Sequence, residues 1–425
     1  MFASYFFDDM FSSVSHLFGH PESLALGWDA KDLGNFIGDY SLLCVCGGLI
    51  VGGILLDIFG VRLMGSIFMS MMLVGGALAW FGVAGGLPKE SAIAVGRIGR
   101  MLFGLGSEIA GVAVTRSLAK WFKGSHMSFA MSLQLAIARA GTGIALIAAP
   151  FIVGVPKDFY PVADTARPAL IGLFLLLAGM IAWAVFVGMD RHFDRKRGIS
   201  FKRGEVGTGE KFSFRDITSL LKNSRFVMIG LLCVTFYCCV SSFKKFGTAV
   251  VIPRFGIEAG AAGTMVAMIP FFTIVFTPMF GALVDKVGHA TKWMILGSLA
   301  VLSGHLILAF APFGEQFFGY AGIALLGLGY SLVPSAMWPS VPKIVPERNL
   351  GTAYSLIYWI QNVGLFFVPK FVGRIFAEDS GLEGVARVEW LFISLGACAI
   401  ILAFCLIRSS LHHPELGLDK ANKKQ

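Results

Sequence analysis

Charged residues are scarce in this chain of 425 residues: they make up 14% of the sequence, whereas hydrophobic residues make up 56%. A soluble protein of this length needs a largely polar and charged surface, so the composition excludes one or two soluble domains. The mean hydropathy of +0.74 leads to the same conclusion. The sequence therefore predicts an integral membrane protein.

Several functional signatures are also missing. No N-x-S/T sequon occurs, so nothing marks a glycosylated lumenal surface. The seven cysteines fall in apolar stretches without metal-like spacing to histidine, which predicts buried free thiols and neither a metal site nor a cofactor. There is no H-x-x-x-x-D pair, no cluster of histidines and carboxylates and no phosphate-binding glycine loop. We therefore expect no enzyme.

The apolar residues are grouped into twelve blocks of about 20 residues, the length that a helix needs to cross about 30 Å of hydrocarbon. We expect spans near 1–19, 36–56, 63–86, 97–121, 127–154, 167–189, 226–251, 261–284, 291–312, 317–342, 352–376 and 386–408. The first block is short and polar and has no basic segment before it. We interpret it as a first helix whose N-terminal half is missing from the sequence, with a re-entrant N-terminus as the alternative.

A strongly basic segment divides the chain. We predict an N-terminal six-helix bundle at 1–189, a basic cytoplasmic linker at 190–225, a C-terminal six-helix bundle at 226–408 and a cytoplasmic tail at 409–425. Basic residues concentrate in the loops on one side, which by the positive-inside rule is cytoplasmic, so both termini should face the cytoplasm. The net charge of +9 is then an orientation signal and does not indicate nucleic-acid binding.

A short motif, G-x-x-x-D-x-x-G, occurs at equivalent points of the two predicted bundles. Its residues are Gly53, Asp57 and Gly60, followed by Arg62, and then Gly281, Asp285 and Gly288. We expect the glycines to let two helices approach closely and the aspartates to cap a helix or pair with a basic residue, latching a gate. The motif resembles the signature loop of the major facilitator superfamily, although Ile58 stands where a basic residue is usual.

A second motif, Arg100-x-x-x-Gly104-x-Gly106, also resembles a superfamily pattern, at the start of the fourth helix. Arg100 either takes part in transport or only snorkels or pairs near the helix end.

Further stretches, at 104–108, 121–124, 134–139, 326–332, 337–339, 344–347, 350–354 and 360–362, resemble the lysosomal dipeptide transporter group of that superfamily. The resemblance implies an all-α membrane protein with the major facilitator fold: two six-helix bundles related by pseudo-twofold symmetry. It also implies dipeptides as substrates, with a preference for those containing lysine, arginine or histidine. We expect a passive carrier, that is, a uniporter. We expect a monomer among membrane lipids, with an accessory membrane protein as a partner only if the chain is eukaryotic.

Glu108 and Arg139 lie deep in their predicted helices, where a charge costs several kcal/mol unless it is paired or faces water. Together they offer both signs of charge, which suits a zwitterion, and the resemblance assigns them to the peptide termini. The alternative is a structural ion pair between the two helices.

Other candidate substrate-binding residues are Trp338, Gln361, Asn362, Tyr5 and Asp9. Trp338 lies among prolines that expose backbone carbonyls, and it either lines the solute path or packs between helices. The two amides either bind a peptide backbone or bridge helices. Asp9 matches the aspartate of the resembled group, where an acidic residue favours cationic substrates.

Three more polar residues lie within predicted spans. We expect Lys244 and Lys245 to snorkel toward the membrane surface, and His305 to be a satisfied interhelical donor.

Two alternatives to dipeptide uniport stay open. One is proton-coupled symport or export of another small organic solute, with Glu108 or Asp9 carrying the proton. The other is a sensor that keeps the fold without transport. We favour a bacterial inner membrane, with a lysosomal membrane as the alternative.

Overall fold

The computed structural model describes residues 1–13, 15, 28–84, 86–122, 127–153, 162–196, 214–346, 350–412 and 418–420. In this part of the chain, 11 helical segments are long and apolar enough to cross a membrane. The predicted all-α membrane architecture is therefore confirmed. The seven cysteines are free, as expected, but Cys46, Cys398 and Cys405 are exposed on the protein surface.

The first group of helices, called here the N-terminal helices, precedes residue 197. It comprises α1 (Phe2–Ser13), α2 (Ala30–Asp39), the π-helical turn η2 (Cys44–Gly48), α3 (Leu49–Phe59), α4 (Val61–Ala84), α5 (Lys89–Trp121), α6 (Met127–Val153) and α7 (Val162–Lys196). Segments α2, η2 and α3 form one membrane span, and α1, with 12 residues, is too short to be among the spanning candidates.

The second group, the C-terminal helices, follows residue 213. It comprises α8 (Phe214–Lys222), α9 (Ser224–Tyr237), the π-helical turn η3 (Cys238–Ser242), α10 (Phe243–Phe255), α11 (Ala259–Val287), α12 (Ala290–Phe310), α13 (Gln316–Met337), the 3-10 turn η4 (Trp338–Ser340), α14 (Val341–Ile344), α15 (Leu350–Glu378) and α16 (Leu382–His412). The predicted division into bundles at residues 190–225 stays a prediction, and residues 197–213 lie outside the described part.

Several helices are longer than the apolar blocks that predicted them. Helix α5 begins at Lys89 and not near residue 97, and α7 continues past residue 189 to Lys196. Hydropathy marks only the part of a helix inside the hydrocarbon, and these polar ends remain helical beyond it. The start of the expected linker is thus the last part of α7.

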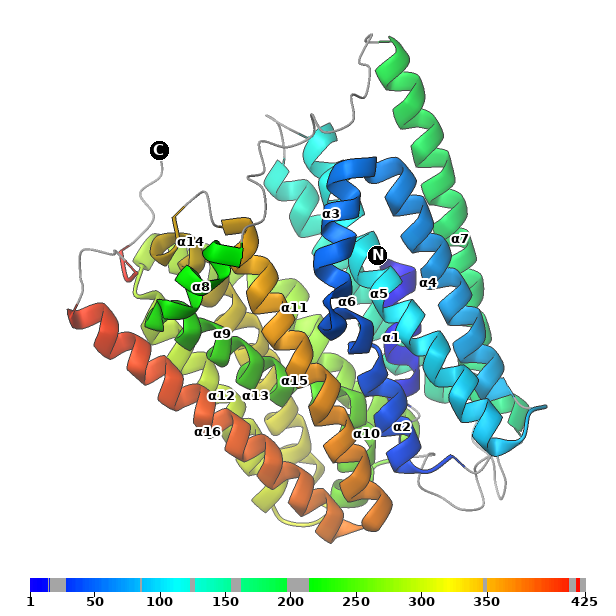
Figure 1. The fold of residues 1–425 in the computed structure, drawn as a ribbon. Helices are drawn as coiled ribbons and strands as arrows, with labels where there is room; N and C mark the ends of the chain where they lie inside the picture. The colour runs from blue at the N-terminus through cyan, green and yellow to red at the C-terminus, as the bar shows by residue number, and fades with distance from the viewer. Residues whose placement is uncertain are drawn as a thin grey trace.

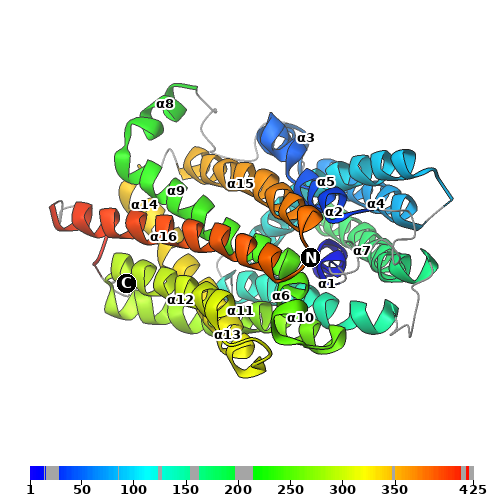
Figure 2. The same cartoon turned by 90° about the horizontal axis from the view of Figure 1, so that it is seen from below.

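The two groups of helices meet closely at one end of the molecule. We call this the outer end; there α2 begins and α15 ends, and the opposite end, where α3 and α7 end, is the linker end. In Figure 1 the groups lie together at the bottom and diverge toward the top, and Figure 2 shows α1, α2, α10 and α15 at the boundary between them. A side chain on Gly34 would lie 2.6 Å from the carbonyl oxygen of Pro369, so α2 and α15 touch through their backbones.

The glycines of the repeated motif do not serve the close approach that we expected. A Cβ atom on Gly53 or Gly281 would meet nothing within 4 Å. The second glycine of each copy has a different role, because Gly60 and Gly288 end their helices with φ angles of 84° and 73°, which L side chains rarely adopt. Asp285 lines a small pocket at the linker end, and the side chain of Asp57 lies outside the described part.

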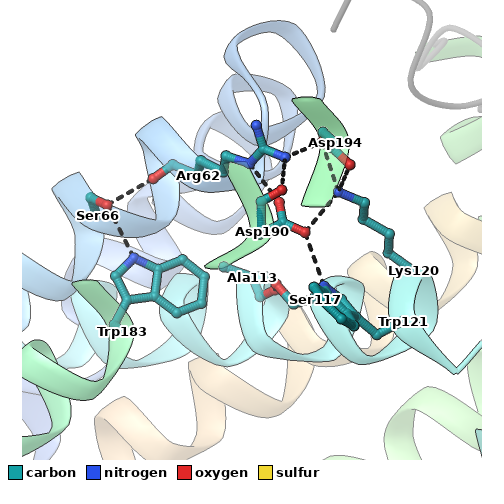
Figure 3. A network of polar contacts seen from close by, with 9 residues as sticks. All are labelled: Arg62, Ser66, Ala113, Ser117, Lys120, Trp121, Trp183, Asp190 and Asp194. Atoms are coloured by element: carbon teal, nitrogen blue, oxygen red, sulfur yellow. Dashed lines mark hydrogen bonds and ion pairs between the residues drawn. The ribbon is translucent and has the colours of Figure 1, made fainter. Parts of the chain in front are cut away.

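Arg62, directly after the first copy of the motif, joins α4 to the end of α7 (Figure 3). Its guanidinium forms ion pairs with Asp190, at 2.5 Å, and with Asp194. Asp190 also accepts hydrogen bonds from Lys120 at 2.7 Å and from the Trp121 indole at 2.9 Å. This network ties α4, α5 and α7 together at the linker end.

Replacing Asp190 by asparagine should destabilise the protein by about 1–3 kcal/mol, because an amide cannot satisfy three donors as a carboxylate does. The readout is the midpoint of thermal unfolding in detergent. The control is Glu383→Gln, which breaks an exposed ion pair with Arg387 and should leave the midpoint unchanged. An equal effect of both substitutions would contradict the structural role of Asp190.

The C-terminal helices have an analogous link at the linker end. Asp419 accepts hydrogen bonds from the backbone N–H and the hydroxyl of Thr291, both at 2.9 Å, and from the hydroxyl of Ser410 at 2.6 Å. The His289 N–H donates to the Asp419 carbonyl at 2.8 Å. Asp419 thus caps the start of α12 and ties it to the end of α16, much as Asp190 ties α4 to α7.

Candidate functional site

A cavity of about 760 Å³ lies between the two groups of helices. It extends from Asp8 and Ile37, near the outer end, to Leu133 and Pro339 on the side of the linker end. Six of the seven predicted substrate-binding residues line it: Tyr5, Glu108, Arg139, Trp338, Gln361 and Asn362. Residues distant in sequence therefore converge on one space.

Asp9 is the seventh, and the structure places it outside the cavity lining. Its side chain is fully buried, accepts a hydrogen bond from Thr142 at 2.6 Å and pairs with Lys244 at 2.8 Å. The neighbouring Asp8 lines the cavity instead, with its side chain 20% exposed. Successive residues of a helix point in different directions, and the sequence pattern alone did not show which one faces the cavity.

Glu108 and Arg139 do not form an ion pair with each other, nor with any other described residue. The Tyr40 hydroxyl donates a hydrogen bond of 3.0 Å to Glu108. The Arg139 guanidinium lies over the ring of Tyr330, 5.2 Å from its centroid. The alternative interpretation, a structural ion pair between α5 and α6, is therefore wrong, and both charges face the cavity without a charged partner.

Aromatic rings form the cavity wall on the side of the C-terminal helices. Trp338 stacks on Tyr358 with ring centroids 4.9 Å apart, and its indole N–H donates to the Tyr237 hydroxyl at 3.1 Å. Tyr330 stands edge-on to Tyr237 at 5.7 Å. Trp338 begins the 3-10 turn after α13, where Pro339 interrupts the regular helix. The sequence indicated Trp338 but missed the three tyrosines, because aromatic residues are common throughout spanning helices.

Gln361 and Asn362 lie in α15 on the cavity wall. The Gln361 side-chain oxygen is 3.5 Å from the thiol of Cys233 in α9. Asn362 donates to the carbonyl of Tyr358 at 3.0 Å, and its side-chain oxygen is buried without a hydrogen-bond partner. Gln361 thus bridges helices, while Asn362 keeps an acceptor to offer.

Charged side chains close the cavity toward the outer end. Lys245 pairs with Asp8 and Asp9, each at 2.6 Å. The expectation that Lys244 and Lys245 snorkel is wrong, because they bridge from α10 to the carboxylates of α1. Arg100 also pairs with Asp8, and its side chain is only 1% exposed, so it does not snorkel.

His305 lies away from the cavity, between α12 and α16. Its Nδ1 atom is 2.7 Å from a carboxylate oxygen of Glu389, and both side chains are fully buried. The interhelical contact agrees with the expectation, but the Nε2 atom of His305 is buried without a hydrogen-bond partner, so the ring is only partly satisfied. The sequence did not indicate Glu389. Among the described residues, no group of three or more histidines, cysteines, aspartates and glutamates could hold a metal ion.

Comparisons with known proteins bear on the family and the fold. The family model described as Major Facilitator Superfamily matches residues 1–369 and 238–422. The lysosomal dipeptide transporter MFSD1 of Danio rerio is 30% identical over 372 residues, covering 87% of this chain and 77% of that protein. The MFSD1 protein of Homo sapiens is 29% identical over 364 residues, covering 84% of this chain and 74% of that protein.

A solved structure shares the arrangement of helices. The crystal structure of the nucleoside transporter NupG superposes with a TM-score of 0.67 at 13% identity, covering 96% of each chain. At this identity the likeness concerns the fold alone, and it confirms the predicted fold class.

Proposed function

The chain belongs to the major facilitator superfamily of membrane transporters, and we propose that it carries dipeptides by alternating access. In this proposal the substrate binds in the cavity between the two groups of helices. Rocking of the groups exposes the cavity first at one end and then at the other.

The observation that carries the proposal is the pair of unpartnered charges in one cavity. Glu108 and Arg139 both line it, and neither forms an ion pair with a described residue. Charges at membrane depth are costly unless they are satisfied, so a ligand that carries both signs of charge suits this pair. The α-amine of a dipeptide would bind Glu108, and its α-carboxylate would bind Arg139.

We place a basic substrate side chain on the aromatic wall. Trp338 and Tyr358 both line the cavity, and aromatic rings attract a cation. At the other end of the cavity, Arg100, Lys244 and Lys245 outnumber Asp8 and Asp9, so a further cation would be repelled there. This arrangement supports the preference for lysine-, arginine- or histidine-containing dipeptides.

Uniport is the proposed mode. Asp8 in the cavity wall and the buried Asp9 beside it are engaged in ion pairs with arginine or lysine. Glu108 is then assigned to the substrate amine, which leaves no further carboxylate there for a coupled proton.

For the membrane setting, we propose a monomer in a bacterial inner membrane with both termini in the cytoplasm. The basic residues of the loops at the linker end and the absence of sequons support this placement. The outer end would then face away from the cytoplasm.

Counterflow in proteoliposomes tests the proposed function. Vesicles loaded with unlabelled Lys-Ala dipeptide should take up labelled Lys-Ala, and labelled His-Ala, faster than vesicles that contain no dipeptide. Labelled free lysine should not enter. An imposed pH gradient should leave the rate unchanged if transport is uniport, whereas acceleration by the gradient would favour proton coupling. Absence of any dipeptide exchange would overturn the proposal.

A further inference from the structure

Two carboxylates at the outer end each have two cationic partners, one from each group of helices. Asp8 of α1 pairs with Arg100 of α5 and, at 2.6 Å, with Lys245 of α10. Asp39 of α2 pairs with Arg97 of α5 at 2.5 Å and with Lys370 of α15 at 2.6 Å. In both cases the arginine belongs to the N-terminal helices, like the carboxylate, and the lysine belongs to the C-terminal helices.

These ion pairs lie where the two groups of helices are in closest contact. The Asp39 side chain is fully buried, and Lys370 is 14% exposed. Also between α2 and α15, a Cβ on Gly34 would be 2.8 Å from the Cα of Gly373. Between α1 and α10, the Thr248 hydroxyl is 2.9 Å from that of Ser15 and 3.2 Å from the carbonyl of Ser12. The outer end is therefore closed in this structure.

We propose that Asp8 and Asp39 are the exchange points of an outer gate, in which each arginine keeps its carboxylate while each lysine is released on opening. The two groups must separate here for the cavity to open at the outer end. Separation breaks contacts between groups and preserves those within a group. Arg97 and Arg100 thus act as permanent partners, and Lys370 and Lys245 as releasable ones.

The physical reason lies in the cost of an unpaired buried charge. A carboxylate that loses its only cation in a partly buried place is strongly destabilised. Because Asp39 retains Arg97, opening strands no anion at α2. The released lysine has a flexible stem that carries its ammonium group into water. The arginines therefore lower the cost of opening at Asp8 and Asp39, while the lysines stabilise the closed state. The fully buried Asp9 pairs with Lys244 and Lys245 of α10 and with none of the described arginines, so it adds to the stability of the closed state.

The two kinds of partner should respond oppositely to substitution. Lys370→Met removes a contact that exists only when the outer end is closed, so the population should shift toward the outer-open state. Arg97→Met leaves Lys370 as the only cation on Asp39. Opening would then leave the carboxylate without a cation, so the population of the outer-closed state should increase. A merely structural role for both residues would move the equilibrium in one direction.

A thiol placed between α1 and α10 reports the equilibrium between the outer-closed and the outer-open state. Thr248→Cys places it at a fully buried position between α10 and α1. An impermeant maleimide, added on the side of the outer end, should label this thiol about ten times faster in Lys370→Met and more slowly in Arg97→Met. Protein without Thr248→Cys gives the blank for the native cysteines, and Lys292→Met, an exposed lysine of α12 at the linker end, is the matched control.

Both variants must keep the wild-type elution profile in detergent. If the labelling rate then changes in the same direction in both variants, or does not change in either, the inference is wrong. If Arg97→Met fails to fold, Arg97→Gln, which removes the charge but keeps a hydrogen-bond donor, repeats the comparison at Asp39. The measurement needs no substrate, so its outcome is independent of whether the carried solute is a dipeptide.

Discussion

Replacing Glu108 by glutamine is expected to weaken dipeptide binding about 10- to 100-fold and to remove discrimination against N-acetylated dipeptides. Glu108 has no ion-pair partner among the described residues and accepts one hydrogen bond, from Tyr40. A hydrogen bond to a charged group contributes about 1.5–3 kcal/mol, and glutamine keeps the shape while losing the charge. The concentration of unlabelled dipeptide that halves counterflow measures the effect.

Changing substrate and protein together shows which end of the dipeptide each residue binds. Wild-type protein should bind Lys-Ala more tightly than its N-acetyl derivative, and Glu108→Gln should bind both alike. Arg139→Gln should instead lose discrimination against the C-terminal amide. Glu315→Gln, an exposed acidic residue before α13, is the control and should behave as wild type. If Glu108→Gln still discriminates against the acetylated peptide, the amine does not bind there.

Replacing Gly34 by leucine is expected to reduce transport to the background rate in protein that still folds. A Cβ at this position would lie 2.6 Å from the carbonyl oxygen of Pro369 and 2.8 Å from the Cα of Gly373. Both obstacles are backbone atoms of the other group of helices, so no side-chain rearrangement can relieve them. The outer end should therefore be unable to close, which removes one of the two states that alternating access requires.

Uptake in proteoliposomes measures the loss, and maleimide labelling of Thr248→Cys should rise in the same variant. The control is Gly188→Leu in α7, where a Cβ atom would meet nothing within 4 Å and the residue is exposed. It should transport normally. Loss of transport without faster labelling would mean that Gly34 is needed for a reason other than closure.

Most of the fold could be predicted from the sequence, because segments that cross a lipid bilayer must be long and apolar and therefore stand out by their hydropathy. Spanning helices must satisfy their backbone internally, so long apolar blocks such as 127–154 map directly onto helices. The predicted helix ends were less accurate, as α7 illustrates, because a helix extends beyond the hydrocarbon when its polar residues find partners there. Asp190 appeared in the sequence as part of a basic linker, yet it accepts hydrogen bonds from three side chains.

The candidate site was only partly accessible, for a geometric reason. Glu108 and Arg139 were conspicuous as isolated charges in apolar runs. The partners of Lys245 were not, because Asp8 is 237 residues earlier in the chain and no local pattern relates them. A lysine in a spanning helix looks the same whether it reaches the membrane surface or a carboxylate on another helix. Tyr237, Tyr330 and Tyr358 were overlooked because only the fold shows which rings share one wall.

The cap on α12 has a consequence for how the protein is made. Asp419, which caps Thr291, is 128 residues further along the chain, after the last spanning helix. At about 5–20 residues per second, a ribosome needs roughly 6–25 s to synthesise that interval. During this time the first turn of α12 lacks its native acceptor. A nascent chain stalled within α16 would thus carry an uncapped helix end, which the finished protein does not.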